Sequence, residues 1–338
     1  MGEVAVARGR GARPCRLGVE ARPTPAAVDA RRALQLGLAV IWLLDGVLQY
    51  QSFMYSTGFT QMLSGTATGN PSAIARPITW DATLVQHHLV LLNTIFATIQ
   101  LLIGLGIAFR PTLRVALAAS VAWSLGVWWF GEGLGGVLSG AADPLNGAPG
   151  AVILYALLAV LLWPADRPAK RAPFPAARAV GAGVARALWL VLWLSQAYFV
   201  LTPGHRAADA ASGMIGDMQG GEPAWLQSAM RGAASLTAHQ GLATSVAFAV
   251  AFVIIGAGVY LPRPAAKATL LLAIAVSAVI WVFVQALGGI LAAGATDVNS
   301  GPPLALLALA YWPSRPGLGM AGPAPAPAAA VVEEGSLA

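Results

Sequence analysis

The 338-residue sequence has few charged side chains and almost no cysteine. Asp, Glu, Lys and Arg together make up 10% of the residues, whereas an ordinary soluble domain carries roughly 25%. A water-soluble globular protein is therefore excluded. Cys15 is the single cysteine, which excludes an internal disulfide and the CxxC pairs that bind zinc or exchange thiols.

The motifs of common soluble enzymes are also missing. The sequence contains no Walker A loop, no HExxH zinc motif and no GxSxG nucleophile elbow. Its glycine-rich run at residues 131–136 ends an apolar segment, so a phosphate-binding loop is not predicted. Nothing resembles a nucleic-acid-binding module. We interpret the net charge of +6 as topogenic charge with attraction to anionic membrane lipid.

Long apolar runs are what the sequence has instead. Hydrophobic residues make up 57% of the chain, and the mean hydropathy is +0.68. Eight apolar segments cover about 33–51, 84–109, 112–137, 148–163, 184–202, 241–261, 265–292 and 301–313. Most reach the roughly 20 residues that cross about 30 Å of hydrocarbon, although the fourth and the eighth are shorter.

The basic residues predict how these segments cross the membrane. Lys and Arg stay on the cytoplasmic side much more than Asp or Glu do. With eight crossings and a cytoplasmic N-terminus, every Lys and Arg except Arg76, Arg206 and Arg231 lies inside. The sequence therefore predicts a multi-pass protein of the plasma membrane with both termini in the cytoplasm.

An internal repeat is the strongest pattern in the chain, with a period of about 153 residues. Residues 103–136 read IGLGIAFRPTLRVALAASVAWSLGVWWFGEGLGG, and residues 255–289 read IGAGVYLPRPAAKATLLLAIAVSAVIWVFVQALGG. Because each repeat would contain an even number of crossings, both copies enter the membrane in the same sense. A pseudo-two-fold axis along the membrane normal would then relate them.

The predicted fold is an all-α membrane protein with eight transmembrane helices in two parallel four-helix repeats. The predicted parts are a disordered basic cytoplasmic tail (1–32), the first repeat (33–164), a basic cytoplasmic linker (165–183), the second repeat (184–313) and a disordered Pro/Ala-rich cytoplasmic tail (314–338). The outer loop after the first helix of each repeat is expected to hold a short interfacial helix.

This four-helix unit resembles the DoxX-like membrane-protein superfamily. The resemblance rests on a long loop after the first helix and a tight basic turn between the second and third, GIAFRPTLRVALAA in one half and GVYLPRPAAKATLLL in the other. It implies a membrane subunit of a quinone-linked oxidoreductase or a membrane partner of a secreted redox protein. A glutamate often found in the second helix of such units is Gln100 here.

Ionisable side chains within the apolar segments are the main evidence for a site, because they are costly in a bilayer. Asp45 and Glu132 lie in the outer half of the first repeat, and the neutral amides Gln196 and Gln285 occupy the matching places in the second. We expect Asp45 and Glu132 to be catalytic, exchanging protons with a bound quinol or substrate. A structural hydrogen bond between helices is the alternative.

Polar and aromatic residues near the outer ends of the segments are further candidates for substrate binding. They are His87, His88, Trp128, Trp129, Asp143, Asn146, Gln196, His239, Gln285, Asp297 and Asn299. We expect His87 to hydrogen-bond a quinone carbonyl and the tryptophans to line the pocket. Helix capping by the histidines, turn formation by the Asx residues and an aromatic belt are the alternatives.

The short fourth and eighth segments suggest where such a site lies. A helix of that length crosses only if the preceding loop sinks into the membrane, where it must be buried in protein or line water. The loops carrying Asp143 and Asp297 are therefore expected to reach outer cavities, one in each repeat. A haem or a metal held by His87 and His239 is less favoured than helix capping, and no metal site is predicted.

Together these patterns predict an integral membrane subunit or anchor of a redox system. Its cofactor is undefined, with a quinone as the candidate, and its partner would be an extracytoplasmic redox protein. Two alternatives remain: a small-molecule or ion permease, and a non-catalytic membrane scaffold for an extracytoplasmic protein. A Gly/Pro-broken helix pair at the midplane, typical of a transport site, is not found.

Overall fold

The computed structural model describes residues 29–164 and 172–314, and within these ranges the chain forms helices and no strands. All eight apolar segments are helical. The first half contains α1 (Ala30–Leu48), η1 (Ser52–Tyr55), α2 (Thr57–Gly65), α3 (Ser72–His87), α4 (Leu89–Ala108), η2 (Arg110–Thr112), α5 (Leu113–Phe130), η3 (Gly133–Gly136) and α6 (Ala151–Leu161). The second half contains α7 (Ala177–Val180), α8 (Ala182–Val200), α9 (Ala210–Asp217), α10 (Ala224–Thr237), α11 (Gly241–Gly258), α12 (Arg263–Val279), η5 (Ile280–Val284), η6 (Ala286–Gly289) and α13 (Gly301–Ala310).

Within residues 29–164 and 172–314, five helical stretches are long and apolar enough to cross a membrane. They are Leu89–Ala108, Arg110–Phe130, Ala182–Val200, Gly241–Gly258 and Arg263–Val284. Helix α1 has 19 residues but carries Arg31, Arg32 and Asp45, and α6 and α13 are shorter apolar helices. The apolar helices thus indicate a multi-pass membrane protein.

The first three residues of α1, 30–32, lie within the predicted disordered N-terminal tail. The Asp29 side chain accepts a hydrogen bond from the backbone N–H of Arg31 at 3.2 Å, and its carbonyl accepts one from the N–H of Ala33 at 3.0 Å. Asp29 therefore caps the helix at its N-terminus. Residues 1–28, 165–171 and 315–338, which hold most of both predicted tails and part of the linker, lie outside the described residues.

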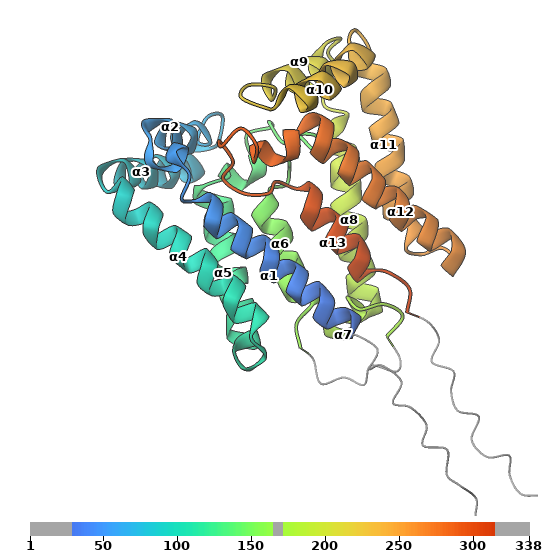
Figure 1. The fold of residues 1–338 in the computed structure, drawn as a ribbon. Helices are drawn as coiled ribbons and strands as arrows, with labels where there is room; N and C mark the ends of the chain where they lie inside the picture. The colour runs from blue at the N-terminus through green and yellow to red at the C-terminus, as the bar shows by residue number, and fades with distance from the viewer. Residues whose placement is uncertain (1–28, 165–171, 315–338) are drawn as a thin grey trace, which may run out of the picture.

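The short helices α6 and α13 lie in the interior and pack against each other and against α1 (Figure 1). Leu158, Ala159 and Leu161 of α6 and Leu307 of α13 are fully buried. One apolar core runs through both halves and includes these side chains. The core therefore joins the halves into one unit.

Two pairs of outer helices lie at the same end of the long helices. Figure 1 shows α2 with α3 and α9 with α10 at this end, whereas η2 and α7 lie at the other. A small apolar cluster of Met54, Phe59, Leu63, Ala82 and Val85 holds α2 and α3 together. These pairs occupy the outer loops in which short interfacial helices are expected.

Candidate functional site

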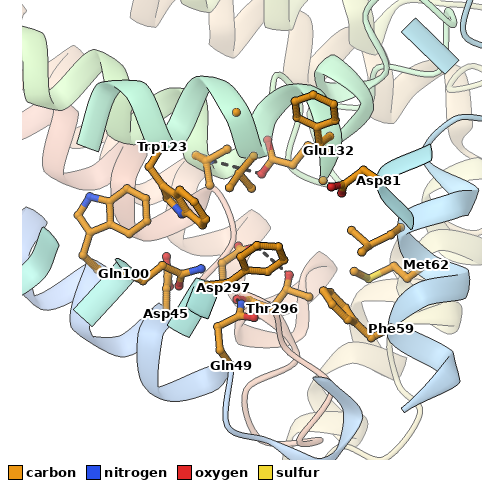
Figure 2. Close-up of a pocket in the computed structure, with 18 of the residues that line it drawn as sticks. Asp45, Gln49, Phe59, Met62, Asp81, Gln100, Trp123, Glu132, Thr296 and Asp297 are labelled. Carbon is orange, nitrogen blue, oxygen red and sulfur yellow. Dashed lines mark hydrogen bonds between the residues drawn. The ribbon is translucent and has the colours of Figure 1, made fainter. Parts of the chain in front are cut away.

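A cavity of about 370 Å³ lies in the first half, between α1, α2, α4 and α5 (Figure 2). Aromatic side chains form much of its wall, namely Trp42, Phe59, Phe96, Trp123 and Phe130. Four carboxyl groups also line it, those of Asp45, Asp81, Glu132 and Asp297. The two predicted catalytic residues, Asp45 and Glu132, therefore reach one cavity.

Asp45 lies in the last turn of α1, on the buried face of the helix. The buried face of this helix repeats with the α-helical period through Leu34, Leu38, Trp42 and Asp45. Only 2% of Asp45 is exposed, and its Oδ1 accepts a hydrogen bond from the backbone N–H of Val298 at 3.1 Å. Helix α1 thus holds a loop of the second half.

One helical turn later, Gln49 holds the same loop. Its Nε2 donates to the carbonyl of Thr296 at 3.0 Å. Residues on both sides of Asp297 are therefore bonded to α1 or to Gln49, the residue that follows it, and this brings the Asp297 carboxyl group from the second half into the wall of the cavity. The spacing of four residues between Asp45 and Gln49 places them on one helix face, a signal that sequence reasoning missed.

The Asp297 carboxylate also organises its own turn. Its Oδ1 accepts the backbone N–H of Asn299 at 2.6 Å, and its Oδ2 accepts the hydroxyl of Thr296 at 2.8 Å. Asn299 in turn accepts the N–H of Ser300 at 2.6 Å, directly before α13. Asp297 and Asn299 thus form the turn hydrogen bonds that the sequence predicts, and Asp297 also lines the cavity.

Glu132 follows the end of α5 and faces the start of α6. Its Oε1 accepts the backbone N–H of Val152 at 3.3 Å, in the first turn of α6, where such groups lack a partner within the helix. Its Oε2 is buried, and among the described residues it has no hydrogen-bond partner. One carboxylate oxygen thus positions the side chain, and the other remains open to a ligand or a proton.

A second cavity of about 270 Å³ lies next to the first. It is lined by polar side chains, those of Glu132, Asp143, Asn146, Asp297 and Asn299, and by the glycine-rich backbone around residues 135–150. Glu132 and Asp297 line both cavities. Both of these cavities lie against the first half, and Asp297 from the loop of the second half lines each of them.

Gln196 and Gln285, the counterparts of Asp45 and Glu132, line neither of these cavities. Both are buried and bonded to the loop of the first half. Gln196 Nε2 donates to the carbonyl of Ala148 at 2.8 Å, and Gln285 Nε2 donates to the carbonyl of Leu145 at 3.2 Å and to Ser300 Oγ at 2.8 Å. In the described structure these amides act as structural links.

The three candidate histidines line neither cavity. His87 and His88 are exposed at the junction of α3 and α4, and His87 Nδ1 lies 2.8 Å from the carbonyl of Thr83. His239 is exposed too, and its Nδ1 lies 3.1 Å from Asp209 Oδ1. No group of three His, Cys, Asp or Glu side chains that could hold a metal occurs in the described part of the chain.

The candidate tryptophans flank the site without lining the first cavity. Trp128 Nε1 donates to the carbonyl of Pro149 at 2.6 Å, and this contact anchors the loop before α6. Trp129 is 39% exposed and stacks on Phe130. Trp123, one turn earlier in α5, does line the cavity, and within the described structure its buried Nε1 has no partner.

Three other lining residues were not selected from the sequence as ligand-binding candidates. Gln100 is 7% exposed, and no described residue bonds its buried Oε1. Thr296 and Asp81 complete the polar wall. Burial raises the pKa of Asp81. Asp81 sits in α3 beyond the apolar segments, so the criterion of a charged residue within an apolar segment could not select it.

Asp143 links the two halves at the far side of the polar cavity. Its Oδ1 lies 2.9 Å from Nε2 of His205, in the loop between α8 and α9, and also accepts the N–H of Leu145 at 2.8 Å. The hydrogen bond with Asp143 raises the pKa of His205, against the opposing effect of burial. Asn146 is exposed on the rim of this cavity.

Comparison with protein-family models, with curated proteins and with solved structures found no match to this chain.

Proposed function

We propose that the protein is a DoxX-like membrane subunit of a redox system and that the cavity between α1, α2, α4 and α5 binds a quinol. The observation that carries this proposal is the convergence of Asp45, Glu132 and Asp297 on one aromatic-walled cavity. Its volume of about 370 Å³ falls in the usual range for small-ligand pockets, roughly 300–1,000 Å³. Aromatic rings can stack on a quinol ring, while carboxylates accept its hydroxyl protons.

Electrons must leave such a quinol together with its protons. Oxidation of one quinol to the quinone releases two protons and two electrons. In our proposal the carboxyl groups take the protons, and an extracytoplasmic redox protein that docks on the outer helices takes the electrons. The helix pairs α2 with α3 and α9 with α10, which lie at the same end of the molecule, would make this contact.

The proposed topology has eight crossings in two parallel repeats within the plasma membrane, with both termini in the cytoplasm. The order α1, α4, α5, α6 is matched by α8, α11, α12, α13. Both α5 and α12 lead into GLGG or ALGG turns with left-handed residues at matching places, Leu134 and Leu287. The short helices α6 and α13 would lie at membrane depth because other helices surround them.

A permease is the second candidate, and one observation favours it. Asp297 of the second half lines a cavity built mainly by the first. Movement between the halves would therefore change the cavity, as alternating access requires.

Binding of decylubiquinol to the full chain in lipid nanodiscs tests the redox proposal, with tryptophan fluorescence as the readout because Trp42 and Trp123 line the cavity. We expect Asp45→Asn and Glu132→Gln each to weaken binding about tenfold, through the loss of a charge-assisted hydrogen bond. Asp217→Asn is the matched control, since Asp217 is an exposed carboxylate of α9. Absence of binding, or equal binding by all variants, would contradict the proposal.

A further inference from the structure

We propose that Glu132, at the boundary that it forms with Asp297, relays protons from the aromatic-walled cavity to the polar cavity, and that protons leave the site through the polar cavity. This inference rests on the proposed function and deepens it by separating the path of the ligand from the path of its protons. Glu132 and Asp297 are the two residues that line both cavities. They therefore form the boundary through which a proton would have to pass.

The two cavities have different linings. The first has the lining expected of a ligand pocket, and the second has the lining expected of a water-filled exit. Aromatic and aliphatic side chains form most of the first wall. Carboxyl groups, amides and backbone groups form the wall of the second, and a polar hollow of about 270 Å³ has the size and partners to hold ordered water. Water can thus carry protons from the second cavity, whereas the first favours an apolar ring.

The rims of the cavities lead to different surfaces. Ala141 and Asn146, which line the polar cavity, are exposed on the loops that precede α6. Ala122, which lines the first cavity, is exposed on the side of α5, next to exposed Leu125. In the proposed topology a lipophilic ligand would enter from the lipid along α5, and protons would leave at the outer end of the bundle.

Glu132 has the free atom that a relay needs. Its Oε1 is held by Val152, and its buried Oε2 has no partner among the described residues. Both oxygens of Asp297, by contrast, accept hydrogen bonds. Glu132 therefore takes the proton from the ligand hydroxyl: the ligand O–H bond breaks, a Glu132 O–H bond forms, and water in the polar cavity then removes the proton.

The charges around this boundary favour a shared proton. Asp45 of α1, Asp81 of α3 and Asp143 of the loop before α6 line the two cavities together with Glu132 and Asp297, and His205 pairs with Asp143 on the far side. Of the described residues, no Lys or Arg lines either cavity. Neighbouring carboxylates around cavities that no Lys or Arg lines do not all ionise, so one holds a proton that another can accept.

Hydrogen–deuterium exchange of the protonated carboxyl groups, followed by infrared spectroscopy on the full chain in nanodiscs, tests the relay. Glu132→Gln and Asp297→Asn assign the carboxyl C=O band. Ala141→Phe should block the polar cavity and slow exchange of this band about tenfold, whereas Ala122→Phe in the first cavity should change it less than about twofold. Asn146→Leu changes a second exposed position on the rim of the polar cavity and should also slow exchange. It keeps the test valid if Ala141→Phe misfolds.

The outcomes separate the relay from the proposed function. Slower exchange in Ala122→Phe but not in Ala141→Phe or Asn146→Leu would overturn the relay, because protons would then use the ligand cavity. Absence of a protonated carboxyl band that Glu132→Gln or Asp297→Asn removes would overturn it too. Slow exchange in Ala141→Phe in a protein that binds no decylubiquinol would leave the relay standing and contradict the quinol site.

Discussion

Asp45 and Gln196 hold matching positions in the two halves, and their chemistry explains why they bond different atoms. A carboxylate only accepts hydrogen bonds, and Asp45 accepts the N–H of Val298. An amide also donates, and Gln196 donates to the carbonyl of Ala148. Each half thus holds the loop of the other, but only Asp45 adds a carboxyl group to a cavity.

Gly150 is the residue that makes room for Glu132. It has a positive φ of 119°, and a Cβ there would overlap Glu132 Oε2. We expect Gly150→Ala to lower the free energy of unfolding in mixed micelles by about 2–3 kcal/mol, from backbone strain and displacement of the carboxyl group.

Gly140→Ala is the control for this prediction. Gly140 also has a positive φ, of 78°, but a Cβ there meets nothing within 4 Å. Gly140→Ala should lower the free energy of unfolding by only about 1 kcal/mol, because alanine is strained in the left-handed conformation. Equal losses in the two variants would show that the contact with Glu132 contributes nothing.

At the scale of elements, the position of α1 depends on bonds made by its buried polar and aromatic side chains. Trp42 Nε1 donates to Ser120 Oγ of α5 at 2.9 Å, and the Trp42 ring packs edge-on against Tyr155 of α6 at a centroid distance of 5.0 Å. These contacts join α1 to two other walls of the site. Trp193, the counterpart of Trp42 in α8, packs on Phe252 instead.

The pair of tryptophans offers a matched test of the α1–α5 contact. Both are 1% exposed, but the buried Nε1 of Trp193 has no partner among the described residues. Trp42→Phe should lower the free energy of unfolding by about 1–2 kcal/mol more than Trp193→Phe, because it also leaves Ser120 without its donor. Unfolding in mixed micelles, followed by circular dichroism, measures the difference, and equal losses would contradict this reading.

At the scale of the whole molecule, the two halves share one core and exchange loops. Gln49 and Asp45 hold the loop around Asp297, while Gln196 and Gln285 hold the loop before α6. The cavity wall therefore depends on both halves. Separate expression of residues 33–164 would remove Asp297 from the site.

Cysteine labelling in intact cells tests the proposed parallel topology. In a Cys15→Ser background, a membrane-impermeant maleimide should label Ser72→Cys in α3 and Ser235→Cys in α10 before lysis, but Thr112→Cys only after it. All three positions are exposed. Labelling of Ser72→Cys and Ser235→Cys from opposite sides would indicate inverted repeats and contradict the parallel arrangement.

The sequence by itself determined the helices and the first pair of site residues. Apolar runs predict helices because helical hydrogen bonds join residues four apart and satisfy the backbone where water is absent. The rarity of charge within these runs selected Asp45 and Glu132, and both line the cavity. The four-residue spacing from Asp45 could have pointed to Gln49 as a site residue. No sequence criterion selected Asp81, because it lies outside the apolar runs.

Only the tertiary structure decided which loop closes which cavity. The bond between Asp45 and Val298 joins residues 253 positions apart, and no local pattern encodes such a pairing. That contact brings Asp297 to the first cavity, whereas packing leaves His87, His88 and His239 exposed and uses Gln196 and Gln285 as links. A helix forms from neighbours along the chain, but a cavity is formed by side chains that meet only when distant segments pack together.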